Sequence, residues 1–468
     1  MEPLRARAGQ VWVLALTSIA SFMISLDSQV VTTALNVIRA DLDASMELLE
    51  WTVNAYILSF AVLLLGGSAL GDRFGRRRML IAGLGLFTAA SAACGAAPNV
   101  ATLIAARAIQ GMGAALVMPL AMALLSGAFS AAERGKALGI FGSITGAAMI
   151  AGPVLGGAIT AGFAWQWIFW INVPIGLILL PLTYRNIGET FGPRAKLDLL
   201  GIALVTIAAL AFVWSLMRGN LIGWSSREVG GGFAIAAIGL ALFIQWEARA
   251  AHPMLSLGLF RRRAFAIGNI ASLPYYAAIY GTTFLLAQFL QAAQGYGPLG
   301  AGLRILPWTA TLFFMAPIAG NLINRVGEKR LVVLGMFLQA TGMGAIALIA
   351  APGLSTWELA LPLVLAGCGG SLVMPAAQSV VLNAAPQIDL GKASGTYNML
   401  RFLGGMLGIA MLVAAFSATG STASPHAFTA GFRCAMAIAA ALSLLGGVAS
   451  LLLPARPATK LVAQPLGA

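Results

Sequence analysis

Long apolar runs recur along the whole chain, and they constrain its fold more than any other feature. Each run has about 20 mostly apolar residues bounded by charged residues, Pro or Gly, the length that carries an α-helix across the hydrocarbon core of a bilayer. Fourteen such runs predict an all-α polytopic membrane protein with fourteen transmembrane helices. The predicted spans begin near Val11, Leu49, Met79, Val100, Ala137, Trp167, Leu199, Val229, Ala264, Ala301, Leu331, Leu359, Ala393 and Phe428.

The composition excludes several other classes of protein. Of the 468 residues, 59% are hydrophobic and 9% are charged, whereas a soluble domain is roughly 25% charged. A soluble enzyme of ordinary composition, a disordered chain and a coiled coil are therefore excluded. Arg5 and Arg7 precede an apolar run as in a signal peptide, but the apolar pattern continues past Asp27, so we expect a retained first helix.

The net charge of +13 comes from short basic clusters between the apolar runs and not from one patch. This distribution argues against nucleic acid as a partner and fits the positive-inside rule. With the N-terminus placed in the cytoplasm, 21 of the 28 Lys and Arg residues fall in inner segments. We therefore predict a multi-pass protein of the plasma (inner) membrane with both termini cytoplasmic.

Residues for enzymatic chemistry are scarce. The two histidines, His252 and His426, lie in predicted loops on opposite sides of the membrane, and the three cysteines are scattered among apolar runs. No Gly-x4-Gly-Lys-Ser/Thr loop for nucleotide phosphates is present. We expect no enzyme activity, no metal and no cofactor.

An internal repeat divides the chain. Gly71-Asp72-Arg73-Phe74-Gly75-Arg76-Arg77-Arg78 follows the second span, and Asn324-Arg325-Val326-Gly327-Glu328-Lys329-Arg330 follows the tenth. Asp72 and Asn324 are 252 residues apart. Since eight predicted spans separate them, each span with its loop takes about 31 residues. Two homologous halves with two inserted helices explain this spacing.

These motifs resemble the major facilitator superfamily, and fourteen spans resemble its drug:proton antiporter branch. Further resemblances are Leu26-Asp27 in the first span, Arg107 and Gln110 in the fourth, Gly152-Pro153-Val154-Leu155-Gly156-Gly157 in the fifth and Asn172-Val173-Pro174 in the sixth. The resemblance implies a major-facilitator bundle of two six-helix halves plus two inserted central helices. The expected domains are residues 1–190, an inserted helix pair at 191–262, and residues 263–468.

Asp27 is the first candidate for proton coupling. It lies about 24 Å into its span, in the outer third of the membrane, where a carboxylate is costly unless it is paired, hydrated or protonated. Arg107 enters its span at a compatible depth and is the predicted partner, and Gln110 shares its helix face. Two alternatives remain. Asp27 can form a purely structural N-cap or helix–helix hydrogen bond, and the long side chain of Arg107 can extend to the outer membrane interface. Glu50, expected to be hydrated at an outer helix end like Glu358, is a candidate second coupling acid.

The two repeat loops predict a conformational latch, in which Asp72 pairs with an Arg and with helix N-terminal amides. Simple retention of the loop in the cytoplasm is the alternative. Since Asn324 replaces the acid in the second copy, the latch should be asymmetric. The predicted latch residues are Gly71, Asp72, Arg73, Gly75, Arg76, Asn324 and Arg325.

Small residues and a proline in the fifth span resemble the antiporter motif that distinguishes exporters from uptake systems in this superfamily. The motif residues are Gly152, Pro153, Gly156 and Gly157. Generic close packing of membrane helices is the alternative explanation.

The predicted substrate cavity combines polar and aromatic side chains. Trp308, Phe313 and Phe314 join the tyrosines as candidate aromatic lining. Lipid-facing rings are the alternative. Arg401 can bind an anionic group or organise the second half, and helix packing is the equal alternative. The assigned cavity residues are Gln29, Tyr56, Gln110, Tyr275, Tyr276, Tyr280 and Arg401.

Together these features predict proton-coupled export of small amphipathic molecules by alternating access, as in drug or metabolite efflux and antibiotic resistance. The expected partners are a small-molecule substrate, protons and the lipid bilayer, with a monomeric chain. A uniporter or symporter of the same fold and a transport-inactive membrane sensor are the alternatives.

Overall fold

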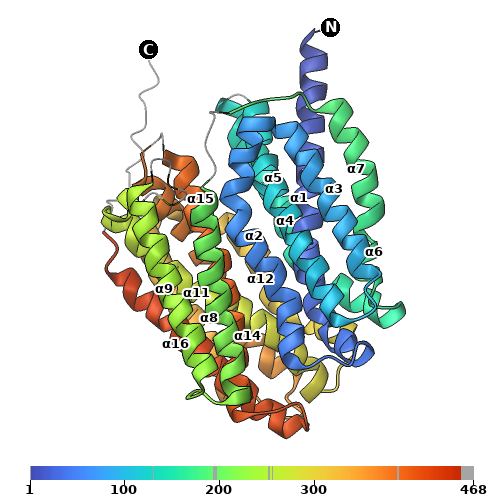
Figure 1. Cartoon of the computed structure of the whole chain (residues 1–468), viewed down its shortest axis with the longest axis vertical. Coiled ribbons are helices and arrows are strands. Elements are labelled where there is room, and N and C mark those ends of the chain that lie inside the picture. The colour runs from blue at the N-terminus through green and yellow to red at the C-terminus, as the bar shows by residue number, and fades with distance from the viewer. Residues whose placement is uncertain are drawn as a thin grey trace.

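The computed structural model describes residues 2–129, 131–192, 198–250, 253, 255, 257–386 and 389–454. The described residues form a helical bundle (Figure 1) and contain no strand. The helices are α1 (Glu2–Asp41), α2 (Met46–Phe74), α3 (Arg76–Gly95), α4 (Val100–Ala128), α5 (Ala131–Gly162), α6 (Trp167–Trp170), α7 (Asn172–Asn186), α8 (Leu199–Ile222), α9 (Arg227–Arg249), α10 (Leu257–Phe260), α11 (Arg263–Gln288) with a π-helical end η1 (Phe289–Ala293), α12 (Pro298–Val326), α13 (Glu328–Ile349), α14 (Thr356–Ala384), α15 (Leu390–Thr419) and α16 (Pro425–Leu451).

Thirteen described helices are long and apolar enough to cross a membrane, with α6 and α7 counted as one span. The remaining long helix, α12, has 29 residues, about 43 Å at 1.5 Å per residue, and packs against α5 and α14. The long helices thus follow the order of the fourteen predicted spans.

Polar caps fix where several helices begin at the end of the bundle opposite the predicted cytoplasmic loops, here called the outer end. A side-chain oxygen at each of these positions accepts a hydrogen bond from the backbone N–H three residues ahead, which satisfies one of the unpaired donors of a helix start. The capping residues are Ser45, Asn99, Ser226, Ser355 and Ser424.

The two repeat loops have the same backbone conformation at the inner end. Gly75 ends α2 with φ +107°, and Gly327 ends α12 with φ +90°. Each glycine donates its N–H to the carbonyl four residues back, Gly71 and Ile323 respectively. Such positive φ angles favour glycine, so the repeat seen in the sequence is also a repeat of turn geometry.

Helices α1–α7 form the N-terminal half and α11–α16 the C-terminal half. The halves meet where α5 packs on α12 and where α2 packs on α15. Helices α8 and α9 pack side by side (Figure 1), and α8 contacts both α2 and α15. His252 lies outside the described residues, and His426 is exposed in the first turn of α16.

Candidate functional site

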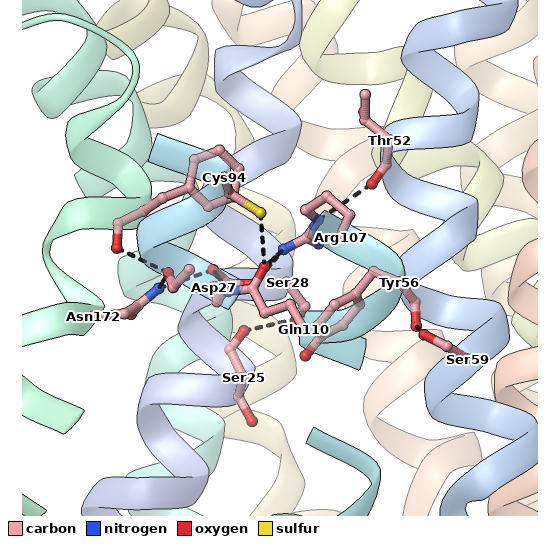
Figure 2. Close-up of polar contacts among 12 residues, drawn as sticks. Ser25, Asp27, Ser28, Thr52, Tyr56, Ser59, Cys94, Arg107, Gln110 and Asn172 are labelled. Atoms are coloured by element: carbon pink, nitrogen blue, oxygen red, sulfur yellow. Dashed lines mark hydrogen bonds and ion pairs between the residues drawn. The ribbon is translucent and has the colours of Figure 1, made fainter. Parts of the chain in front are cut away.

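A buried polar cluster in the N-terminal half is centred on Asp27. Arg107 donates from Nη1 to Asp27 Oδ2 over 2.5 Å. Gln110 and Asn172 each donate to the other carboxylate oxygen, Oδ1, over 2.9 Å. The cluster joins α1, α4 and α7 (Figure 2). The structure thus brings the predicted pair into contact. It adds a donor, Asn172, which belongs to the Asn172-Val173-Pro174 motif but is not among the predicted site residues.

Arg107 has several further partners. Its Nη1 also donates to Gln110 Oε1 over 2.7 Å, and its Nε donates to the carbonyl oxygen of Thr52 over 3.2 Å. The guanidinium carbon lies 4.1 Å from the centre of the Tyr56 ring, within the range of a cation–π interaction. Tyr56, predicted to line the cavity, is therefore part of the polar cluster. These other contacts can keep the Arg107 guanidinium in place even when its ion pair with Asp27 is broken.

Asn172 is itself positioned by α3. Its Nδ2 lies 3.1 Å from Ser91 Oγ, and that hydroxyl donates to the carbonyl oxygen of Phe169 over 2.9 Å. Cys94, one turn further along α3, lies with its sulfur 3.6 Å from Gln110 Oε1. These contacts fix the amide groups that face Asp27.

The cluster is closed to solvent in this state. Asp27, Arg107 and Asn172 are each 1% exposed, and Gln110 is fully buried. Removing one partner of such a pair leaves an uncompensated buried charge, which costs about 3–5 kcal/mol. Any change in the charge of Asp27 must therefore rearrange its neighbours. Asp27 lies well inside the bundle, because α1 continues from Asp27 to Asp41, about 21 Å of helix.

The Gly-Pro segment of α5 contacts both halves. Added methyl groups at Gly152 and Gly156 would collide with Gln29 and with the Val30 backbone on α1, within two turns of Asp27. A methyl group at Gly157 would collide with the backbone of Pro298 on α12. The small residues therefore let α5 approach the Asp27 helix on one face and the C-terminal half on another. Gln29, predicted for the cavity, packs in this α1–α5 contact.

Gly302 of α12 makes the reciprocal approach to Pro153 possible. The Pro153 carbonyl oxygen is the atom that a methyl group on Gly302 would meet. The close contact between α5 and α12 thus depends on one glycine from each helix, Gly157 and Gly302.

A row of aromatic rings connects the two halves at the level of the cluster. Phe60 lies between Tyr56 and Phe402, with ring centres 6.1 and 4.4 Å away. Phe402 in turn lies 6.3 Å from Tyr280. Tyr56 and Phe60 belong to α2, Phe402 to α15 and Tyr280 to α11, so the aromatic side chains lie in the interface between the halves.

A second polar cluster lies in the C-terminal half around Arg401. The Tyr276 and Tyr397 hydroxyls lie 3.0 Å apart, and the Tyr275 hydroxyl donates to the carbonyl of Gly370 over 3.0 Å. The Arg401 guanidinium lies 5.1 Å from the Tyr276 ring centre. No described carboxylate forms an ion pair with Arg401, and its Nε is buried without a hydrogen-bond partner.

The other predicted aromatic residues separate. Trp308 is buried, whereas Phe314 is 68% exposed. Both residues belong to α12 but lie in different environments. The sequence does not show which face of a helix its neighbours cover. The side chain of Phe313 lies outside the described residues.

The inner loop of the N-terminal half is held by a residue that the sequence analysis missed. Asp72 pairs with Arg76, Oδ1 to Nη2, over 2.8 Å. The α3 N-terminal amides, however, are bound by Glu189, which accepts from the backbone N–H of Arg77 and Arg78 over 2.9 and 3.3 Å. The predicted pairing of Asp72 with those amides is wrong, because the segment after α7 already occupies them.

The rest of the predicted latch lies at the two inner turns. Arg73 is exposed, with its guanidinium 5.2 Å from the Phe74 ring centre. Gly71 packs against Leu120 of α4. In the second copy Arg325 is exposed, and the side chain of Asn324 lies outside the described residues.

Glu50 and Glu358 have different environments. Glu358 is exposed and forms a capping box with Ser355. Glu50 is 1% exposed, with Asn54 donating to it over 3.3 Å. The expectation of a hydrated Glu50 is wrong, because α2 is covered by α4, α15 and α8.

The model of the Major Facilitator Superfamily matches residues 17–409. The chain belongs to the major facilitator superfamily. It is a multi-pass membrane transporter and not an enzyme.

Two similar members of the superfamily are resistance proteins. Multidrug resistance protein Stp of Mycobacterium tuberculosis (strain CDC 1551 / Oshkosh) is 35% identical over 420 residues, covering 89% of this chain and 78% of the relative. The tetracenomycin C resistance and export protein of Streptomyces glaucescens is 33% identical, covering 88% and 77%. A solved POT family transporter, in complex with a thioalcohol conjugated peptide, is 14% identical with a TM-score of 0.71, covering 92% and 94%. That likeness shows the shared major-facilitator fold.

Proposed function

We propose that this chain exports small amphipathic molecules in exchange for protons by alternating access. The observation that carries the proposal is the buried ion pair of Asp27 and Arg107. An ionisable pair inside the membrane is costly and is a default candidate for ion coupling. The resistance proteins among the relatives support drug or metabolite efflux.

The proton step follows from the contacts of Asp27. A proton placed on Oδ2 removes the charge that attracts Arg107 and meets the N–H that now points at that oxygen. Gln110 Oε1, the Thr52 carbonyl and the Tyr56 ring remain to hold the guanidinium. Proton uptake therefore moves α1 relative to α4 without leaving Arg107 unpaired.

Contacts between the halves support a state that is closed at the outer end. Gln291 donates to the carbonyl oxygen of Thr33 over 2.8 Å, and Arg39 donates to Thr422 over 2.8 Å. Gly157 and Pro298 meet in the same outer half of the bundle. For substrate to leave, these contacts must open, and the α5 segment transmits the movement of α1 to α12.

Substrate binding is assigned to the centre of the interface. Phe60, Phe402 and Tyr280 offer apolar ring surface from both halves, and Arg401 offers a positive charge without a described carboxylate partner. This combination favours an aromatic compound that carries a hydrogen-bond acceptor or a negative charge. Glu50, a buried acid on α2, is the candidate for a second coupled proton.

The test is transport by purified protein in liposomes with an imposed pH gradient. Tetracenomycin C and methylenomycin A serve as probes, because relatives carry resistance to them. We expect gradient-driven movement by the parent protein and its loss in Asp27→Asn. Asp43→Asn is the matched control, since Asp43 is exposed in the outer α1–α2 turn at φ 47°, which Asn also adopts.

Other outcomes would decide between the alternatives. Movement of probe and protons in the same direction would make the protein a symporter, and movement independent of the gradient would make it a uniporter. Binding without flux would favour a sensor. Gradient-driven transport that is unchanged in Asp27→Asn would contradict the proposed role of Asp27.

A further inference from the structure

A cavity of about 880 Å³ lies at the inner end of the C-terminal half, away from the Asp27 and Arg401 clusters. Arg325, Lys329 and Arg330 line it from the α12–α13 turn. Leu334 and Leu451, which are 53% and 50% exposed, line it from the exposed sides of α13 and α16. The cavity therefore combines a cationic rim at the predicted cytoplasmic surface with an apolar wall of exposed leucines on helices expected to span the membrane.

The fourth charged residue of the rim is already engaged. Glu328 Oε1 accepts hydrogen bonds from Ser379 Oγ and Asn383 Nδ2 on α14, over 2.5 and 2.7 Å. Within the described part of the chain, no ion pair involves Arg325, Lys329 or Arg330. The rim thus keeps an excess of positive charge over its single carboxylate.

The N-terminal half shows what occupies the equivalent place there. A shift of 252 residues relates Arg77 and Arg78 to Lys329 and Arg330, and α7 packs on α3 as α16 packs on α13. In the first half, Glu189 lies just after α7 and binds both the amides and the guanidinium groups of Arg77 and Arg78. The helix start therefore binds an anion in the first repeat.

The described residues of the second half supply no counterpart of Glu189 at this cavity. Leu453 and Pro454, just after α16, line the cavity, and Glu328 is the one acid among the described residues that line it. Because Glu328 is held by α14, the three cations of the rim are left to bind an added anion.

We propose that the cavity binds an anionic phospholipid of the inner leaflet. The phosphate lies among Arg325, Lys329 and Arg330 at the start of α13, and an acyl chain lies along Leu334 and Leu451. Basic pockets between transmembrane helices on the cytoplasmic side suit anionic headgroups, and the apolar wall selects a lipid over a soluble phosphate.

Native mass spectrometry of the purified full-length chain tests the proposal. Phosphatidylglycerol and phosphatidylcholine with identical acyl chains are added separately, and the lipid-bound fraction is measured. We expect retention of phosphatidylglycerol by the parent protein and roughly 30-fold weaker binding by the double variant Lys329→Gln/Arg330→Gln, because each cation near the surface contributes about 5-fold.

A charge-matched control is Arg185→Gln/Arg249→Gln. It removes two exposed cations from the last turns of α7 and α9, at the same end of the bundle, and should leave lipid retention unchanged. Equal retention of the two lipids by the parent protein would overturn the proposal. So would an equal loss in both double variants, or displacement of the lipid by an equal concentration of glycerol phosphate, which would identify a soluble anion as the ligand.

Discussion

Asn172 of α7 donates a hydrogen bond to the same oxygen of Asp27, Oδ1, that Gln110 of α4 reaches, at the same distance of 2.9 Å. The two amides hold one carboxylate oxygen and leave Oδ2 to Arg107. This division separates the oxygen that is fixed in place from the oxygen that can take a proton.

Asn172→Ala should therefore lower proton-driven transport about tenfold, since a hydrogen bond to a charged group contributes about 1.5–3 kcal/mol. Initial rates in liposomes under a fixed pH gradient provide the measurement. Asn186→Ala is the control, because Asn186 lies on the same helix and donates to the Leu182 carbonyl away from Asp27. Equal rates in the parent and Asn172→Ala would show that Asn172 does not support coupling.

Gly157→Ala should abolish transport and lower stability by about 1–3 kcal/mol, since its methyl group would overlap the Pro298 and Leu299 backbone across the interface between the halves. Gly142→Ala, on the same helix with open space around it, should be tolerated. Thermal melting and transport rates are measured together. A stable and fully active Gly157→Ala protein would contradict the proposed coupling of α5 to α12.

Glu189→Gln should destabilise the inner loop by about 1 kcal/mol, because the amide lacks the charge that binds the α3 N-terminus and Arg77. Hydrogen exchange at the start of α3 reports this opening directly. The control Glu228→Gln removes an acid from the first turn of α9 and should leave exchange at the α3 start unchanged. Unchanged exchange in the α3 start of Glu189→Gln would exclude the role assigned to Glu189.

Arg401→Gln should weaken binding of anionic aromatic probes about tenfold and leave neutral probes of the same size nearly unaffected. The removed charge is the one beside Tyr276 and Phe402 that no described carboxylate neutralises. Equilibrium binding to the purified protein is compared with that of Arg433→Gln, a variant at an exposed arginine of α16. An equal loss for neutral and anionic probes would indicate a purely structural role for Arg401.

Much of the architecture is predictable from local pattern. Apolar runs give the helices because a membrane demands about 20 apolar residues per span. The recurrence of Gly75 and Gly327 marks the two repeat turns. The Asp27–Arg107 pair is predictable because two opposite charges inside a membrane at similar depths have few other partners.

The features that the sequence does not predict depend on long-range contacts, which hydrophobic periodicity does not encode. Glu189 appears in the sequence as a loop acid, and only the return of the segment after α7 places it on α3. Glu50 sits at a helix start but is covered by neighbouring helices. Phe314 and Trp308 belong to one helix, yet one is exposed and the other buried. Helix rotation within the bundle decides such cases.

The most direct test of the central claim is proton exchange on ligand binding. Purified protein in weakly buffered detergent solution is titrated with a transported probe, and the change in pH is recorded for the parent and for Asp27→Asn. We predict that the parent protein releases protons when it binds the probe. We predict that Asp27→Asn binds the probe without releasing protons. Equal proton release by both proteins, or binding by the parent without any release, would contradict proton coupling through Asp27.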